Sequence, residues 1–503
     1  MKLKGVLLVF MLAACSAVWA LVPPRNPEDT AAYRELLQRM MRSKAARAPQ
    51  REAGIATPAF FPRVPVIMVN YTDMSYRVSR ADVDSMLNGE HFTLYGATGS
   101  VRRYFYDQSE GLYNPRFDIY GPVTASRNYA YYGAGNGSSR ATELMLEACA
   151  LMDDSLDFTL YDTDGDGTVD MVYVLYAGPP ASDGACTPTS WISNPTSQLI
   201  WPHYWTVSDA GMTSKRHVFD NVTVEGYEVS SELDGCASSQ TTTVMAGVGL
   251  ACHEFGHGMG LPDLYSTNGA NHKTCGMWDI MDYGCYNNDV RTPPAYSAYE
   301  RWFMGWKTPR LLAAPETVSL AAINAGGESL LIASSGTHNL NGVTPSPADF
   351  YIVENRQKTG WDAYIPGEGM MVTHIRYDAG RWSLNHVNND VDAMGVDIVE
   401  ADGLQPTSSQ SDLFYGKPGD LYPTGSDSFT ECANYAVTNI TASAGLVHFN
   451  FTCGTATPDA PTLSPYGDDE TVYTLTGQPV RLAECPHGIF IVHRNGKTYK
   501  IIK

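Results

Sequence analysis

The sequence predicts an α+β protein of several domains. The chain has 503 residues, which is long enough for two to four domains. It is 44% hydrophobic and only 17% charged, a composition typical of folded chains. Counts of 45 Gly, 30 Pro and 30 Tyr indicate many turns and much β-structure. A helix is expected over residues 241–259, and short apolar runs separated by turn residues follow from about residue 313.

The first 20 residues are typical of a secretory signal peptide. Two lysines precede a short apolar run, and small residues follow up to Ala20, where cleavage is expected. Residues 12–15 resemble a bacterial lipobox, so lipid attachment at Cys15 is an alternative. Because no later apolar run is long enough to span a membrane, we expect a secreted or cell-surface protein without a transmembrane segment.

Residues 21–58 are expected to form a pro-segment. Asn26 and Pro27 predict the N-cap and the first position of a helix, and the stretch 21–52 carries a net charge of +3. The whole chain carries −20, so the residues after 52 are strongly acidic. Nucleic acid and anionic membrane surfaces are therefore disfavoured as partners, because both attract basic patches. An ordinary N-terminal helix packed on the domain is the alternative to a pro-segment.

A metal-binding motif lies within the helix predicted around residue 253. His253 and His257 share one helix face, so they can bind one zinc ion, and Glu254 adjoins the first of them, within reach of a metal-bound water. Gly260 permits a sharp turn that brings Asp263 back to the metal. The spacing HExxHxxGxxD is of the metzincin type, with Asp in place of a third His. Close packing against a neighbour is indicated by glycines at positions 247, 249, 256 and 258.

A second motif supports a metzincin-like zinc peptidase domain. Met281 fits the tight turn beneath the metal in such domains, and Tyr283 is a candidate for stabilising the developing oxyanion. Glu300, on a later predicted helix, is the alternative third zinc ligand. We prefer Asp263, because Gly260 and Met281 both fit the metzincin plan.

The two motifs, HEFGHGMGLPDLY and WDIMDYG, resemble the immune inhibitor A family of secreted bacterial zinc metallopeptidases. The resemblance implies a secreted endopeptidase made as a zymogen. No Cys lies within residues 21–58, which excludes latency through a Cys bound to zinc in that segment. Further similar segments are residues 65–73, 99–111, 162–178, 200–203, 294–306, 354–357 and 366–369.

A calcium-binding loop is predicted at residues 162–170. Its carboxylates stand at loop positions 1, 3, 5 and 9, with Gly at position 6, as calcium loops require. The Glu expected at position 12 is missing and the loop leads into a strand, so we expect a structural Ca²⁺ site and no sensor hand. The expected ligands are Asp162, Asp164, Asp166, Thr168 and Asp170.

The zinc peptidase domain is expected over residues 59–312, and a β-sandwich over 313–453. Residues 454–470 have the composition of a linker, and 471–503 predict a small β module that is similar to the C-terminal sorting modules of some secreted bacterial proteins. The apolar runs that predict sandwich strands are residues 329–333, 350–354, 370–377, 395–400 and 447–451.

Two features beyond the zinc motif are left open by the sequence. Disulfides Cys275–Cys285 and Cys432–Cys453 are candidates because each pair is close in sequence. A polar cluster is expected to be a surface loop, with a second calcium site as the alternative. Its members are Asn385, Asn388, Asn389, Asp390 and Asp392.

The function predicted is a monomeric, zinc-dependent endopeptidase that acts on proteins or peptides, with Glu254 as general base. A catalytically spent, calcium-stabilised surface adhesin is the main alternative, and the intact HExxH motif argues against it. An exopeptidase would need a group that binds a chain terminus, and the sequence reveals none.

Overall fold

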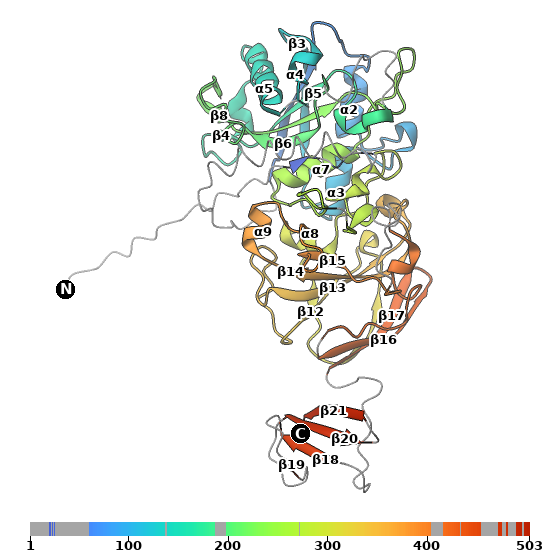
Figure 1. Cartoon of the computed structure of the whole chain (residues 1–503). Helices are drawn as coiled ribbons and strands as arrows, with labels where there is room; N and C mark the ends of the chain where they lie inside the picture. The colour runs from blue at the N-terminus through green and yellow to red at the C-terminus, as the bar shows by residue number, and fades with distance from the viewer. Residues whose placement is uncertain are drawn as a thin grey trace, which may run out of the picture. The chain divides into compact units, whose positions relative to one another are not determined.

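Figure 1 presents a computed structural model of the chain. The described residues are 20, 21, 23 and 25, then 60–453 apart from 136–137, 187–197, 271, 404–415 and 433, and four strands between 471 and 502. The chain divides into two compact units, residues 1–454 and 455–503. The helix expected after Asn26 lies outside the described residues.

A six-stranded mixed sheet, in the order β1-β6-β9-β5-β2-β3, forms one part of the larger unit. Strands β3, β2, β5 and β9 run parallel, whereas β6 and the two-residue β1 join antiparallel at one side. Parallel strands are usually covered on both faces, and β2 is buried at six of its eight residues. The bounds are Ala20–Leu21 (β1), Arg63–Asn70 (β2), Arg116–Thr124 (β3), Val172–Tyr176 (β5), His203–Thr206 (β6) and Gly226–Ser231 (β9).

Short helices lie around the sheets of the larger unit, and side chains cap most of their N-termini. Ser79, Ser100, Asn128, Ser297 and Asp378 each accept a hydrogen bond from the backbone of the first helical turn. The helices are Arg80–Asn88 (α2), Val101–Gln108 (α3), Tyr129–Tyr132 (α4), Ser138–Met152 (α5), Gly249–Gly258 (α7), Ala298–Phe303 (α8) and Ala379–Ser383 (α9). Short 3-10 turns are Leu94–Gly96 (η1), Phe158–Tyr161 (η2), Ala181–Cys186 (η3), Gly276–Trp278 (η4), Tyr283–Tyr286 (η5), Ile323–Ala325 (η6), Gly360–Asp362 (η7) and Pro418–Asp420 (η8).

The β-rich part of the larger unit contains a five-stranded sheet, β10-β12-β13-β14-β15, and a three-stranded sheet, β11-β17-β16. Leu330 and Ile332 of β12 enter a core shared with the three-stranded sheet, whereas Leu331 and Ala333 enter the core that also contains α7. The five-stranded sheet therefore lies between two cores, and α7 lies between it and the six-stranded sheet (Figure 1). The bounds are Arg310–Leu311 (β10), Glu316–Leu320 (β11), Leu330–Ala333 (β12), Asp349–Arg356 (β13), Gly369–Arg376 (β14), Val396–Ile398 (β15), Tyr435–Ser443 (β16) and Leu446–Cys453 (β17).

Two small sheets complete the described elements. One, in the order β4-β8-β7, follows the acidic loop at residues 162–170. The other forms the smaller unit, in the order β19-β18-β20-β21. The bounds are Thr168–Val169 (β4), Val218–Phe219 (β7), Val222–Val224 (β8), Thr471–Thr474 (β18), Pro479–Val480 (β19), Ile489–Arg494 (β20) and Lys497–Ile502 (β21).

The helix predicted over residues 241–259 is too long at its N-terminal end, because α7 begins only at Gly249. The preceding residues pair instead with the chain just after β9: Met245 forms a β-bridge with Leu233, and the Ala246 N–H donates to the Glu232 carbonyl. Three consecutive Thr at 241–243 and a Gly at 247 have low helix propensity, so tertiary pairing prevails there.

Candidate metal centre

Helix α7 carries both histidines of the motif, and its glycines allow close approach of its neighbours. A Cβ at Gly249 would stand 2.0 Å from the carbonyl oxygen of Cys285, and a Cβ at Gly256 would stand 2.6 Å from Sδ of Met281. Both neighbours belong to the turn segment that follows η4. The close packing expected from the glycines is therefore present, and it presses this turn against the helix.

The two histidines face each other through their Nε2 atoms, which are 3.1 Å apart. Nδ1 of His253 lies 2.6 Å from the Ile280 carbonyl, and Nδ1 of His257 lies 2.8 Å from the Leu261 carbonyl. Since a carbonyl only accepts, each Nδ1 carries the proton and each Nε2 is left with a lone pair. Burial lowers the pKa of His253, which favours the neutral ring.

Asp263 completes the group from the loop after α7. Gly260 turns the chain with φ +99°, a conformation that favours glycine. The buried Asp263 Oδ1 then lies 3.4 Å from His253 Nε2 and 3.2 Å from His257 Nε2. The other carboxylate oxygen, Oδ2, accepts a 2.6 Å hydrogen bond from Nδ2 of Asn385.

The donor set of this group fits a zinc ion. Two imidazole lone pairs converge on one point, and Asp263 Oδ1 is buried without a hydrogen-bond partner among the described residues. Such an arrangement is unfavourable without a cation, because lone pairs and a carboxylate oxygen face one another. Two His and one Asp are ligands typical of catalytic zinc, and carbonyls on the outer nitrogens are the usual orienting partners.

Glu254 lies next to His253 in α7 and is completely buried. Its Oε2 accepts a 2.6 Å hydrogen bond from the backbone N–H of Tyr204 in β6. The carboxylate is therefore fixed by the sheet strand that borders the metal group. Sequence reasoning gave Glu254 a role but missed Tyr204, because a backbone donor leaves no signal in residue type.

Met281 and Tyr283 lie in the turn beneath and beside the group. The Met281 N–H donates to Oδ1 of Asp279 at 2.8 Å, and Sδ of Met281 contacts α7 at Gly256. Tyr283 begins η5 and packs edge-on against Tyr265, at 6.5 Å between ring centroids. The turn also supplies the Ile280 carbonyl to His253, so it supports the metal group directly.

Glu300 lies outside the group formed by the two histidines and Asp263. Its Oε2 accepts hydrogen bonds from the backbone N–H and the hydroxyl of Ser297, at 2.7 and 3.0 Å, in a capping box at the start of α8. Burial and the neighbouring Asp279 raise the pKa of Glu300. The structure thus gives this side chain a helix-capping position, away from the histidine pair.

Comparison with known proteins agrees with this geometry. Residues 69–308 match the family described as immune inhibitor A peptidase M6, catalytic domain. These residues form a peptidase domain of the immune inhibitor A family. The resemblance stated from the two motifs is confirmed, and the histidines, Glu254 and Asp263 all lie within the matched region of this metallopeptidase domain.

Two relatives illustrate the extent of the similarity. The pre-pro-metalloprotease PrtV of Vibrio cholerae serotype O1 is 25% identical over 244 residues, which cover 43% of this chain and 24% of the relative. Immune inhibitor A of Bacillus thuringiensis subsp. alesti is 26% identical over 285 residues, which cover 48% and 39% respectively. The chain thus spans well under half the length of either relative.

The acidic loop of the peptidase domain brings three carboxylates together. Asp162, Asp164 and Asp166 offer ligand atoms within 4.8 Å of one another, and Asp162 Oδ1 is buried without a hydrogen-bond partner among the described residues. Thr168 begins β4 as the loop ends. The Asp170 carboxylate accepts hydrogen bonds from the backbone N–H and the hydroxyl of Thr163. Burial raises the pKa of Asp170 to about 6.

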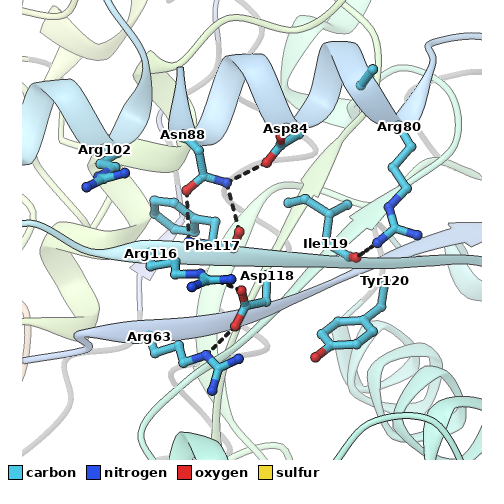
Figure 2. Close-up of a pocket in the computed structure, with 11 residues that line it drawn as sticks. Arg63, Arg80, Asp84, Asn88, Arg102, Arg116, Phe117, Asp118, Ile119 and Tyr120 are labelled. Carbon is cyan, nitrogen blue, oxygen red and sulfur yellow. Dashed lines mark hydrogen bonds and ion pairs between the residues drawn. The ribbon is translucent and has the colours of Figure 1, made fainter. Parts of the chain in front are cut away.

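An open hollow of the peptidase domain lies elsewhere, over α2 and β3 (Figure 2). Its volume is about 1010 Å³, and none of the metal-group residues lines it. Four arginines border it, yet each has a partner: Arg63 and Arg116 bind Asp118, Arg80 donates to a carbonyl, and Arg102 donates to Asn114. Engaged guanidinium groups make this hollow a structural feature of the sheet edge.

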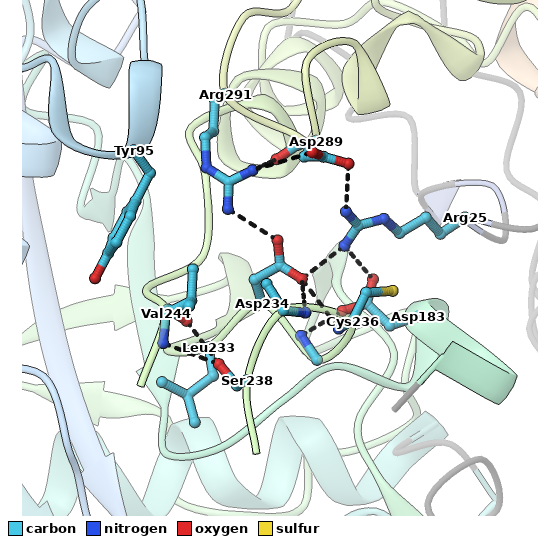
Figure 3. A network of polar contacts seen from close by, with 12 residues as sticks. Arg25, Tyr95, Asp183, Leu233, Asp234, Cys236, Ser238, Val244, Asp289 and Arg291 are labelled. Atoms are coloured by element: carbon cyan, nitrogen blue, oxygen red, sulfur yellow. Dashed lines mark hydrogen bonds and ion pairs between the residues drawn. The ribbon is translucent and has the colours of Figure 1, made fainter. Parts of the chain in front are cut away.

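An ion-pair network holds a residue from the N-terminal segment (Figure 3). Arg25 lies 2.8 Å from Asp234, 3.4 Å from Asp183 and 3.2 Å from Asp289. Asp234 also binds Arg291 at 3.1 Å. Burial raises the pKa of Asp183 to about 6, and the positive charge of Arg25 opposes that rise. The network is a further feature that no sequence motif announced.

The expected disulfide around the turn is wrong, because Cys275 and Cys285 are both free cysteines. The expected partner of Cys453, Cys432, is also free, so that pairing is wrong too. All three thiols are buried, and burial raises the pKa of each. Packing and hydrogen bonds, without a covalent bridge, therefore hold the turn in place.

Across the described residues, no helix has the length and apolar character needed to cross a membrane.

Proposed function

We propose that the chain is a secreted, zinc-dependent endopeptidase that hydrolyses protein substrates. The observation that carries this proposal is the convergence of two histidine Nε2 atoms and one unpaired carboxylate oxygen beside Glu254. The proposed zinc ligands are His253, His257 and Asp263. Glu300 is the weaker candidate for third ligand, because its carboxylate caps α8.

A bound zinc ion would supply Lewis-acid chemistry, polarising a water molecule and the scissile carbonyl. Glu254 takes a proton from the attacking water and delivers it to the leaving amine. The Tyr204 N–H holds one oxygen of Glu254, which fixes the direction of the other. Tyr283 is proposed to stabilise the oxyanion that develops on the substrate.

The contacts of the N-terminal segment favour synthesis of the protein as a zymogen, in which this segment keeps substrate out of the site by steric blocking. β1 pairs antiparallel with β6, and Leu21, which remains after cleavage of the proposed signal peptide, lies opposite His203 at the strand edge next to Glu254. An extended substrate would use the same kind of edge pairing. Arg25 anchors this segment in the acidic network. The name of the Vibrio relative, a pre-pro-metalloprotease, is in line with such a segment.

The finer organisation also belongs to this proposal. We take the peptidase domain as metzincin-like, the sheets after residue 312 as a β-sandwich, and residues 471–503 as a small β module with a sorting role. A structural Ca²⁺ at Asp162, Asp164 and Asp166 is supported by their proximity. Export through a signal peptide at residues 1–20 and a monomeric state complete it.

The decisive experiment compares the wild type with Glu254→Gln, after removal of the N-terminal segment. Both proteins should bind one zinc ion per chain, and only the wild type should cleave casein. Equal cleavage by both proteins would refute the role of Glu254. A wild type that binds no zinc would refute the proposal and favour a spent binding protein.

A further inference from the structure

The polar segment at residues 385–389 contacts the loop that carries the third proposed zinc ligand. Asn388 is buried, and its Nδ2 donates to the Leu264 carbonyl at 2.8 Å. Asn389 Oδ1 accepts from the Thr267 N–H at 2.7 Å. Three asparagines that follow α9 therefore support this loop. The first of them, Asn385, lies 122 residues after Asp263 in the sequence.

Asn385 makes the contact closest to the metal group. Its Nδ2 donates to Asp263 Oδ2 at 2.6 Å, and its Oδ1 accepts from the Asp263 N–H at 2.7 Å. The residue is 1% exposed, and its own carbonyl accepts from the Thr267 hydroxyl at 2.6 Å. Both ends of one amide are thus committed to one aspartate, one to its backbone N–H and one to its carboxylate.

This pairing leaves the two oxygens of Asp263 in different positions. Oδ2 is taken by Asn385, whereas Oδ1 faces the histidine pair and has no hydrogen bond from the described part of the chain. An aspartate at 385 would lack the donor and would repel Asp263, and an alanine would leave Oδ2 buried and unpaired. Asparagine also tolerates the φ of +57° at this position.

We propose that Asn385 is a positioning residue that presents Asp263 Oδ1 to the metal as a single-oxygen ligand. The inference rests on the proposed function, since it takes Asp263 as the third ligand. It also assigns part of the metal centre to a segment beyond residue 308, where the family match ends.

The test measures metal binding to the full chain with a competing chelator and does not depend on hydrolysis. Asn385→Asp and Asn385→Ala should each lower zinc affinity by about 10- to 100-fold, the usual effect of losing a partner that orients a metal ligand. Asn389→Ala is the matched control, because it removes hydrogen bonds to the same loop without touching Asp263. Its zinc affinity should equal that of the wild type.

Cobalt substitution adds a readout that loop stability alone would not move. The visible absorption bands of bound Co²⁺ report ligand geometry, so they should change in Asn385→Asp and stay the same in Asn389→Ala. Melting of the metal-free proteins identifies any variant that fails to fold, and Asn385→Asp, of nearly identical size, is then the deciding variant.

Three outcomes separate the hypotheses. Wild-type affinity and spectrum in both Asn385 variants would overturn the inference and leave the proposed function intact. Equal losses in Asn385→Ala and Asn389→Ala would also overturn it, in favour of general anchoring of the loop. Absence of zinc binding by the wild type would refute the proposed function itself.

Discussion

Replacing Gly249 by alanine tests whether close backbone approach decides the stability of α7. The added Cβ would stand 2.0 Å from the Cys285 carbonyl oxygen and 3.0 Å from that of Val290. Both are backbone atoms of packed segments, and Cys285 is completely buried. Relief of the clash therefore requires the whole turn to move by about 1.5–2 Å, since heavy atoms pack at about 3.5–4.0 Å.

The expected magnitude follows from two opposing effects. Overpacking costs about 1–3 kcal/mol, and a clash with backbone belongs at the upper end of that range. Alanine in place of glycine in a helix returns at most about 1 kcal/mol. We therefore expect Gly249→Ala to lower the free energy of unfolding by about 2 kcal/mol.

Gly256→Ala is the control, because it adds the same methyl group to the same helix. Its Cβ would meet Sδ of Met281 at 2.6 Å, and a methionine side chain can shift where a backbone cannot. The loss should therefore be smaller, about 1 kcal/mol or less. Urea unfolding with a chelator present measures both variants without a contribution from bound metal. Equal or higher stability of Gly249→Ala would refute the reasoning.

Three further predictions follow from buried charges and the acidic loop. Burial raises the pKa of Asp282 from 3.8 to about 7, so the folded state binds more protons than the unfolded state between these values. Stability should be highest below pH 4 and fall by roughly 4 kcal/mol as pH rises through 7 on account of this group; Asp282→Asn should flatten that slope in urea unfolding at a series of pH values, and an unchanged slope would contradict the assignment. Arg356 is buried, and its guanidinium lies 2.6 Å from Asp362, so Arg356→Met should lower the free energy of unfolding by about 3–5 kcal/mol. Arg310→Met, in an exposed ion pair, should lower it by less than about 1 kcal/mol. Similar losses for the two variants in calorimetry would count against a special role for the buried ion pair. Added Ca²⁺ at about 100 times its dissociation constant should stabilise the wild type by about 2.7 kcal/mol, and Asp164→Asn should weaken that gain, whereas an identical calcium response would refute the loop as the site.

The sequence predicted that the side chains of the proposed metal group lie close together, because their proximity is local. His253, His257 and Asp263 lie within one helix and the turn that follows, so helix periodicity and a single glycine suffice to bring them together. Regular apolar runs likewise predicted β12, β13, β14, β15 and β17. Strands with polar alternation, such as β11 and β16, gave too weak an apolar signal to be recognised.

The remaining features depend on contacts between distant segments. Nothing in residue type links Asn385 to Asp263 or Arg25 to Asp234, because a hydrogen bond or ion pair formed across the fold has no periodicity in sequence. The start of α7 was misplaced for a related reason: strand-like pairing of residues near 245 with the end of β9 overrides local helix signals. Proximity in sequence also misled the pairing of Cys275 with Cys285.

The Asn385–Asp263 contact places a partner of the proposed metal group outside the limits of the recognisable domain. A chain that ended at residue 308 would retain every letter of HExxHxxGxxD while losing the amide that orients its last carboxylate. It would also expose Leu264 and Trp278, which belong to a core shared with the five-stranded sheet. A genome survey that scores relatives by this motif alone would therefore also accept truncated or recombined chains in which the Asp of the motif lacks such a hydrogen bond.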